Sequence, residues 1–222
     1  ATTFQVRVLG TCPLGQTLQG INADGSVVCF DNPIPPRLST VDSTGTLGVY
    51  ISLALGTDGF PVISYNEENS RNLKVVKCND AACAPGGETI SIVDSAGDVG
   101  TDNSLAIGTD GFPVISYFDD TNDDLKVVKC NDPACAPGGE TFTTVDGGGD
   151  VGWYTSLAIG TDGFPVISYR DNTNQDLKVV KCNDPACAPG GETITTVDSA
   201  GNVGWMSSLA IGTDGFPVIS YR

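Results

Sequence analysis

The chain repeats itself every 52 residues, and this periodicity restricts the possible folds more than any other feature. The segment GTDGFPVISY occurs four times, beginning at Gly56, Gly108, Gly160 and Gly212. The segment LKVVKCND occurs three times, beginning at Leu73, Leu125 and Leu177. A period near fifty residues is typical of stacked supersecondary units or of a closed ring of them. Because the copies are so alike, we expect no single copy to carry a unique catalytic constellation.

Each repeat is predicted to contain four short β-strands. In the second copy these strands are expected at Ser104–Gly108, Pro113–Tyr117, Leu125–Cys130 and Thr141–Val145. An Asp-Gly turn separates the first two strands, and β-branched residues dominate the last three. The pattern predicts an all-β fold, a β-propeller of about four four-stranded blades, whose copies begin near residues 52, 104, 156 and 208.

The segment SLAIGTDGFPVISY resembles the inner hairpin of bacterial secreted β-propeller repeats, including those of the NHL-like type. Those repeats show an apolar strand, an Asp-x-Gly turn and a second apolar strand that ends in an aromatic residue. The resemblance extends over residues 37–222 and implies a fold rather than a function. The cysteine-containing loop of each repeat departs from the pattern of those families.

The strand count predicts an unfinished last blade. The third strand type occurs three times, whereas the other types occur four times if Leu38–Asp42 is counted as a strand of the fourth type. We expect Leu38–Asp42 to close the ring by joining the last blade. An N-terminal strand is expected to fill the remaining gap, within one chain or between molecules, and exchange between molecules generates a head-to-tail fibre. Further blades beyond Arg222 are the alternative interpretation.

Residues 1–36 are predicted to form a separate disulfide-closed hairpin segment that precedes the repeats of residues 37–222. Phe4–Leu9 and Ser26–Phe30 have the composition of strands, and prolines between residues 33 and 36 form a stiff linker. The stretch from Cys12 to Cys29 is similar to short cysteine-bounded motifs of bacterial surface and fibre proteins. The candidate assembly residues of this segment are Phe4, Val6, Val8, Val27 and Val28.

Eight cysteines fall into close pairs, and the sequence contains no histidine. Paired spacing favours disulfides and an oxidising, extracellular compartment, whereas a zinc site needs four ligands from two tighter knuckles. Without histidine, Ser-His-Asp and Cys-His catalysis are excluded. The predicted disulfides are Cys12–Cys29, Cys78–Cys83, Cys130–Cys135 and Cys182–Cys187.

The formal net charge of −16 restricts the possible partners. Nucleic acid and anionic membrane surfaces attract Lys and Arg patches, which this chain lacks. No apolar run approaches the ~20 residues of a membrane span. The expected partners are therefore further copies of the same chain, or a glycan or protein at a cell surface.

The copies differ mainly in two sets of loops, which are predicted to emerge on one face of the ring. Trp and Tyr in the loops that precede each first strand suit stacking on a sugar or anchoring of a protein, and capping of the core is the alternative. The candidate binding residues are Tyr50, Trp153, Tyr154, Trp205 and Met206.

Acidic residues are dense in the loop between the second and third strands of the second copy. Ca²⁺ takes six to eight oxygen ligands, yet the run lacks the spacing of an EF-hand loop. A solvated loop is the favoured interpretation, no cofactor is expected, and calcium is the weaker alternative. The calcium candidates are Asp119, Asp120, Asp123 and Asp124.

Taken together, these features predict a secreted structural or adhesive propeller protein without enzymatic activity. In its sharper form the hypothesis is a subunit of an extracellular filament, a homopolymer joined by N-terminal strand exchange. A lectin-like module that uses the aromatic loops is the competing hypothesis. An enzyme ranks third, because the paired carboxylates that suggest glycosidase chemistry recur identically in every turn.

Overall fold

The computed structural model describes residues 12, 16–22, 24, 26–31, 38–43 and 48–222. Contacts divide the chain into two compact units, Ala1–Leu38 and Ser39–Arg222. The described residues contain strands, turns and loops but no helix. The protein is therefore all-β, as the sequence predicts.

The N-terminal unit contains one antiparallel hairpin, formed by β1 (Gln16–Ile21) and β2 (Val27–Asp31). The turn is fixed by Asp24, whose Oδ1 accepts hydrogen bonds from the backbone N and the Oγ of Ser26, at 2.9 and 2.6 Å. The predicted strand at Ser26–Phe30 is confirmed with a shift of one residue. The predicted strand at Phe4–Leu9, and with it Phe4, Val6 and Val8, lies outside the described residues.

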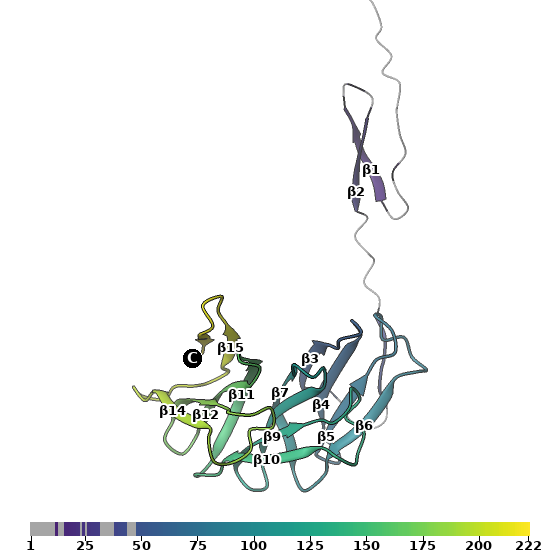
Figure 1. Ribbon diagram of the computed structural model, residues 1–222. Coiled ribbons are helices and arrows are strands. Elements are labelled where there is room, and N and C mark those ends of the chain that lie inside the picture. Colours follow the sequence, from purple (N-terminus) through teal and green to yellow (C-terminus); the bar gives the residue numbers. More distant parts are fainter. Residues whose placement is uncertain (1–11, 13–15, 23, 25, 32–37, 44–47) are drawn as a thin grey trace, which may run out of the picture. The chain divides into compact units, whose positions relative to one another are not determined.

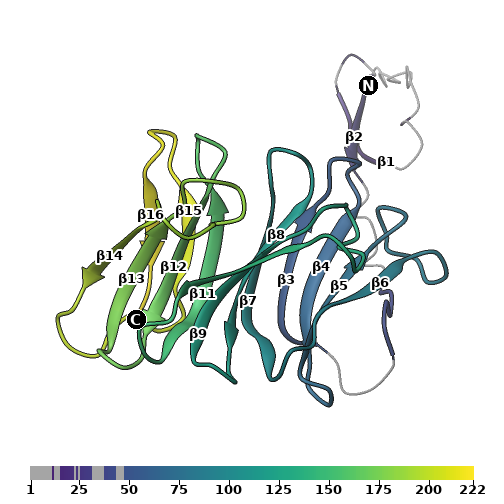
Figure 2. The same ribbon diagram turned by 60° about the horizontal axis from the view of Figure 1, so that its bottom comes forward.

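The second unit contains four antiparallel sheets that follow one another in chain order, from blue to yellow in Figures 1 and 2. The first sheet consists of β3 (Val49–Leu55), β4 (Pro61–Glu67), β5 (Asn72–Lys77) and β6 (Thr89–Asp94). The second consists of β7 (Val99–Ile107), β8 (Pro113–Asp119), β9 (Asp124–Lys129) and β10 (Thr141–Asp146). The third consists of β11 (Val151–Ile159), β12 (Pro165–Asp171), β13 (Asp176–Lys181) and β14 (Thr193–Asp198). The fourth has two strands, β15 (Ser208–Ile211) and β16 (Pro217–Ser220).

The Asp-Gly turn that opens each sheet is held by its own side chain. Asp58 Oδ1 accepts the backbone N–H of Phe60 at 3.0 Å, and Gly59 adopts a φ of 78°, which favours glycine. The second carboxylate oxygen of Asp58 lies 2.7 Å from Lys77 Nζ, and this ammonium group also donates to the carbonyl of Cys78. The turn therefore ties the first strand pair to the start of the cysteine loop.

All four predicted disulfides are present in the structure. In each of the three cysteine loops the bridge spans five residues, with Cα atoms 4.9 to 5.0 Å apart. The loop backbone is also held by Asp80, Asp132 and Asp184, which accept N–H groups two and four residues further on. Such disulfides indicate an oxidising, extracellular setting.

Consecutive sheets pack face to face through apolar side chains. Val62, Leu73 and Val75 of the first sheet form one buried cluster with Leu105 and Ile115 of the second. An equivalent cluster joins the second sheet to the third. Serine hydroxyls bridge the first strands of successive sheets: the Oγ atoms of Ser52, Ser104 and Ser156 accept the N–H groups of Leu105, Leu157 and Leu209, at 2.9 to 3.0 Å.

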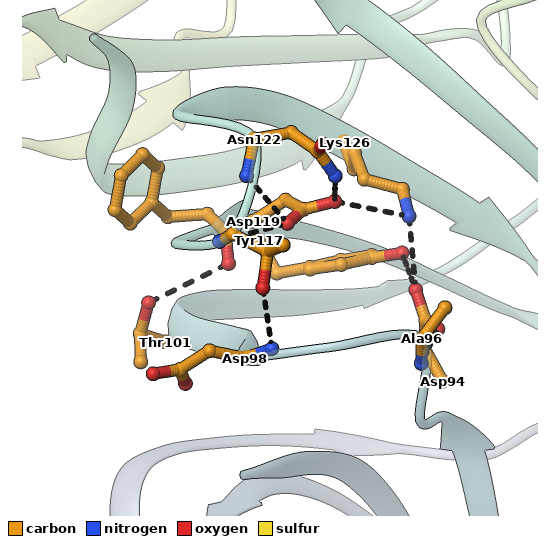
Figure 3. A network of polar contacts seen from close by, with 10 residues as sticks. Asp94, Ala96, Asp98, Thr101, Tyr117, Asp119, Asn122 and Lys126 are labelled. Atoms are coloured by element: carbon orange, nitrogen blue, oxygen red, sulfur yellow. Dashed lines mark hydrogen bonds and ion pairs between the residues drawn. The ribbon is translucent and has the colours of Figure 1, made fainter.

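A buried Tyr–Asp–Lys contact also joins each pair of consecutive complete sheets. At the end of β6, Asp94 Oδ2 accepts the hydroxyl of Tyr117 at 2.6 Å and lies 3.0 Å from Lys126 Nζ, both from the second sheet (Figure 3). Asp146 makes the same contacts with Tyr169 and Lys178 of the third sheet. We call this recurring contact the inter-sheet latch.

One predicted strand is wrong: residues Leu38–Asp42 contain no strand. No sheet edge among the described residues pairs with this segment, so its backbone cannot join a ladder. Val41 instead packs against the first sheet, and Asp42 accepts the Tyr65 hydroxyl at 2.7 Å and lies 3.8 Å from Lys74 Nζ. The segment thus takes the place that Val93 and Asp94 occupy against the second sheet.

The outer faces of the first and last sheets are uncovered. Leu53 is 58% exposed, whereas its counterpart Leu105 is 6% exposed. At the other end, Val218 is 64% exposed, whereas Val166 is 5% exposed. Within the described residues no strand pairing joins the fourth sheet to the first, and closure into a propeller ring stays a prediction.

Candidate functional site

An unusual backbone conformation recurs within or just before the first strand of every repeat. The register between β7 and β8 shifts twice before Ser104, and β3 and β11 show corresponding shifts, whereas β15 pairs with β16 without a shift. The residue at the centre of this segment, which we call the bulge centre, has a positive φ although it is not glycine, at Tyr50, Asp102, Tyr154 and, in the turn before β15, Met206. Such conformations are uncommon for these residue types and are maintained by surrounding structure.

The glycine two residues before the bulge centre shows how the module imposes this geometry. Gly100 has a φ of 86°, and a Cβ at this position would lie 2.8 Å from Leu73 Cβ of the preceding sheet. Gly152 and Gly204 are constrained in the same way against Leu125 and Asp176 or Leu177. Close packing between sheets therefore fixes the bulge, and the central side chain is left free to differ between copies.

In the second, third and fourth repeats, the residue after the bulge centre makes hydrogen bonds between sheets. Asn103 accepts the Ser64 hydroxyl at 2.5 Å and donates to the carbonyls of Tyr50 and Gly100. Thr155 and Ser207 make hydroxyl contacts of 2.7 and 2.8 Å with Ser116 and Ser168. In these three repeats the loop before the first strand thus combines one polar residue that bonds to the preceding sheet with one side chain that differs between copies.

The four bulge centres and the residues that follow them line a single depression of about 240 Å³, which we call the bulge cavity. Every repeat contributes two residues to it: Tyr50, Ile51, Asp102, Asn103, Tyr154, Thr155, Met206 and Ser207. Tyr50 is 49% exposed and Met206 is 71% exposed, so these side chains are open to solvent. Three of the five predicted binding residues, Tyr50, Tyr154 and Met206, are brought together here.

Asp102 is the one charged residue that lines the bulge cavity. Its Oδ2 accepts the backbone N–H of Tyr154 at 3.0 Å. Burial raises the pKa of the Asp102 carboxyl, and the nearby charge of Asp120 adds to this, although the hydrogen bond from Tyr154 opposes it. The pKa values of the Tyr50 and Tyr154 hydroxyls are also raised, first by burial and then by the charge of Asp102.

The two tryptophans belong to a row of aromatic rings beside the cavity. Ring centroids lie 5.0 Å apart for Phe118 and Trp153, 6.1 Å for Trp153 and Tyr154, and 5.5 Å for Tyr154 and Trp205. The guanidinium of Arg170 lies 4.4 Å from the ring centroid of Trp205. The indole N–H groups of Trp153 and Trp205 donate to Asp150 and Asn202. Trp153 and Trp205 therefore pack laterally, and neither lines the bulge cavity.

A second depression of about 430 Å³ adjoins Tyr50 and contains the carboxyls of Asp98 and Asp120. Asp98 Oδ2 lies 2.5 Å from Nη1 of Arg71. Burial raises the pKa of Asp120, and the charge and hydrogen bond of Asp98 raise it further. In the next copy the equivalent pair is Asp150 and Asn172, whose Nδ2 donates to Asp150 at 2.6 Å. The contact is therefore a bridge between two loops that recurs in the next repeat. In this copy both residues of the bridge are acids.

The four calcium candidates point to different surroundings. Asp119 is fully buried and accepts hydrogen bonds from Thr121 and Asn122, and it lies 3.4 Å from Lys126 Nζ (Figure 3). Asp120 faces Asp98 in the neighbouring loop. Asp123 has a φ of 61° in the turn, and Asp124 begins β9. In the part of the chain that the structure describes, no three His, Cys, Asp or Glu side chains form a group that could hold a metal ion.

Asp102 was missed as a candidate by the sequence reasoning, although it lies in one of the variable loops that precede each first strand. The sequence pattern that points to Asp102 is that the four bulge centres are Tyr, Asp, Tyr and Met. A single charged residue therefore occurs among three large side chains. The latch lysines Lys74, Lys126 and Lys178 were also missed, because their partners lie in the preceding repeat or segment.

The chain matches no protein-family model, and no curated protein sequence matches it. Across the described ranges, no helix has the length and apolarity that a membrane crossing requires. Function is therefore inferred from the residues of this molecule alone.

Proposed function

We propose that the protein is a non-enzymatic structural module of propeller type that assembles into an extracellular filament. Copies are joined when the N-terminal strand of one chain completes the fourth sheet of another. The observation that carries this proposal is the fourth sheet itself, which has two strands where its three predecessors have four. An open strand edge is a template for pairing with another segment.

The missing strand would cover surfaces that are buried elsewhere in the molecule. In the third sheet, β12 pairs along its outer edge with β13, whereas β16 has no outer partner among the described strands. Val197 of β14 is 52% exposed, whereas its counterpart Val145 is 7% exposed and packs near Val180 of β13. One added strand would therefore both extend the β16 ladder and bury Val197.

The charge of Asp198 indicates which kind of segment would fit as the missing strand of the fourth sheet. Asp198 accepts the Tyr221 hydroxyl at 2.7 Å, but no lysine or arginine of the described residues forms an ion pair with it. In both inter-sheet latches, and in the corresponding contact of Asp42, a lysine of the third strand supplies that cation. The corresponding contact at Asp198 thus lacks its cation together with its strand.

The N-terminal sequence supplies a matching pattern. Val6-Arg7-Val8-Leu9 has the same order of apolar, basic, apolar and apolar residues as Leu73-Lys74-Val75-Val76 of β5. In this register Arg7 takes the position of Lys74, opposite Asp198, and Val6 and Val8 take positions whose counterparts in β5 are fully buried. The proposal therefore assigns Val6–Leu9 as the donated strand.

The test is a charge exchange in the full-length chain, measured by sedimentation velocity and negative-stain microscopy. Arg7→Glu places two acids together in a covered sheet and should shorten or abolish filaments, whereas Arg7→Lys should assemble normally. Combining Arg7→Glu with Asp198→Lys should restore assembly. Filaments that are unchanged by Arg7→Glu, or by removal of residues 1–11, would show that this strand is not the donor.

Binding of a glycan or protein by the aromatic loops is the second candidate function. The partly exposed rings of Trp153, Tyr154 and Trp205 support it, because aromatic rings at a surface suit sugar stacking. Against it, the rings pack on one another and both indole N–H groups are already bonded within the chain. A blank glycan array together with normal adhesion of a Trp205→Ala variant would remove this candidate.

A further inference from the structure

We propose that the bulge cavity binds a small organic cation with a methylated ammonium group, held between Tyr50, Tyr154 and the carboxylate of Asp102. This binding site is independent of the filament proposal, because none of its residues belongs to the open edge of the fourth sheet. The ligand class follows from the three kinds of surface that the cavity presents.

The first kind of surface is aromatic. Tyr50 and Tyr154 are bulge centres of the first and third repeats and line the same depression of about 240 Å³. The charge of Asp102 acts on both hydroxyls, so the two phenol groups lie within electrostatic range of that carboxylate. Aromatic rings hold quaternary ammonium groups through cation–π contact, and a carboxylate in the same depression adds an attractive charge.

The second kind is polar but already satisfied. Asn103, Thr155 and Ser207 line the cavity, yet each is bonded to a serine of the preceding sheet. Asn103 and Ser207 also donate to the carbonyls of Tyr50 and Tyr154. These groups have few hydrogen bonds left to offer, which disfavours a polyhydroxylated ligand such as a sugar and favours one bound by charge and apolar contact.

The third kind is electrostatic. No lysine or arginine lines the cavity, and the nearest basic influence on Tyr154 is Arg170, which is held over Trp205 and bonded to Val203 and Asn172. Asp120 and Asp98 act on Tyr50 from the adjoining depression. The lining therefore carries a single negative charge within a chain of net charge −16, and a cation is the complementary ligand.

Asp102 is a costly residue for the fold, which supports a binding role. Burial raises the pKa of its carboxyl, so keeping this group charged costs the folded state stability. A neutral Asp102→Asn variant retains an oxygen that can accept the Tyr154 N–H. We therefore expect this variant to melt at a higher temperature than the native chain at pH 7.

The experiment is a calorimetric titration of the full-length protein with choline chloride, with the neutral isostere 3,3-dimethylbutan-1-ol as the control ligand. We expect choline to bind and the neutral analogue to bind about tenfold more weakly, since the analogue loses both the ion pair with Asp102 and the cation–π contacts with the tyrosines, each worth a factor of a few. Asp102→Asn should weaken choline binding by a few-fold, through loss of the ion pair alone, while raising the melting temperature. Tyr50→Leu should weaken it by a few-fold through loss of one aromatic wall.

The matched control is Asp123→Asn, which removes the same charge from a turn residue whose φ of 61° asparagine tolerates well. This variant should bind choline like the native chain. Equal binding of choline and its neutral analogue would overturn the proposal, as would unchanged affinity of the Asp102→Asn variant. Absence of any heat up to about 50 mM choline, a concentration that detects even millimolar sites, would overturn it as well.

Discussion

Two acids meet at Asp98 and Asp120, where the next repeat pairs Asp150 with Asn172. A carboxylate can accept from an amide, but two carboxyls can share a hydrogen bond only if one of them keeps its proton. The pKa of Asp120 is accordingly raised above its ordinary value of 3.8, by burial first and by Asp98 second. The native protein therefore holds the Asp120 proton up to a higher pH than the unfolded chain does.

We expect Asp120→Asn to stabilise the protein at neutral pH. Because the folded pKa is raised, the native state loses stability as the pH rises from about 3.8 through that folded pKa, and the amide removes this loss. The gain should be about 0.5 kcal/mol, at the low end for a hydrogen bond because Asp120 is exposed.

Chemical denaturation at pH 3 and pH 7 measures this effect, with the gain present at pH 7 and nearly absent at pH 3. The reverse change at the equivalent site, Asn172→Asp, is the matched control and should destabilise at pH 7. A stabilisation of equal size at both pH values would contradict the shared proton.

At the scale of elements, the latch is the contact by which one sheet recognises the next. Tyr117 is fully buried, and its hydroxyl donates to Asp94, which Lys126 also approaches. Burial alone would raise the pKa of Asp94, but the hydrogen bonds from Tyr117, the Ala96 N–H and Lys126 outweigh it, and the pKa is lowered. The latch therefore contributes stability above about pH 3.8 that is lost as the pH falls through the lower folded pKa.

We expect Tyr117→Phe to cost about 2 kcal/mol of unfolding free energy at pH 7, since hydrogen bonds to buried charged groups contribute ~1.5–3 kcal/mol. Tyr221→Phe is the internal control, because Tyr221 makes the same bond to Asp198 but is exposed and has no lysine beside it. Its cost should be below about 0.5 kcal/mol. Urea denaturation of both variants measures the two losses of unfolding free energy. Equal losses would mean that burial and Lys126 add nothing to the stability that the latch contributes.

The strands themselves were predictable from local chemistry. Asp-Gly turns and β-branched runs placed β8, β9 and β10 to within two residues at each end. The first strand was expected at Ser104–Gly108 but begins at Val99, because the bulge at Asp102 lets the glycine-containing loop continue the pairing. That bulge depends on contact with Leu73 of the preceding sheet, which no local pattern reveals.

The candidate site was predictable in part for the same reason. Differences between copies identified Tyr50, Tyr154 and Met206, since a position that varies within a fixed module is one that the fold does not determine. Their convergence on one cavity required the stacking of four sheets. The strand expected at Leu38–Asp42 failed because a strand needs a paired edge, and sequence composition does not supply one.

At the scale of the whole molecule, the two uncovered faces are copies of surfaces that pack together inside it. Leu53 and Ile63 on the first sheet correspond to Leu105 and Ile115, and Ala210 and Val218 on the fourth correspond to Ala54 and Val62. Between the first and second sheets, Ala54 and Val62 pack against Leu105 and Ile115. The faces are therefore mutually complementary, and either ring closure or contact between molecules would satisfy them.

The position of residues 38–42 favours closure of the ring, with this segment serving as the last strand of the fourth sheet. Val41 and Asp42 already occupy, against the first sheet, the place of the last strand of a preceding sheet. Only a third strand is then needed between β16 and this segment. A chain extended after Arg222 by a copy of residues 171–187 would supply that strand and its cysteine loop, whereas a copy of residues 171–198 would also add a rival for the place of Asp42.

We expect the shorter extension to give a monomeric protein that is more stable than the native chain by at least about 1.5 kcal/mol, since the added strand buries Val197. The longer extension should gain less, because its copy of Asp198 competes with Asp42 for Tyr65 and Lys74. Urea denaturation and sedimentation velocity measure both quantities, and the shorter extension with its two central valines changed to aspartate is the control. A greater gain in unfolding free energy from the longer extension would show that residues 38–42 do not complete the fourth sheet. If residues 38–42 do complete it, the added copy of β14 has no exposed surface left to bury.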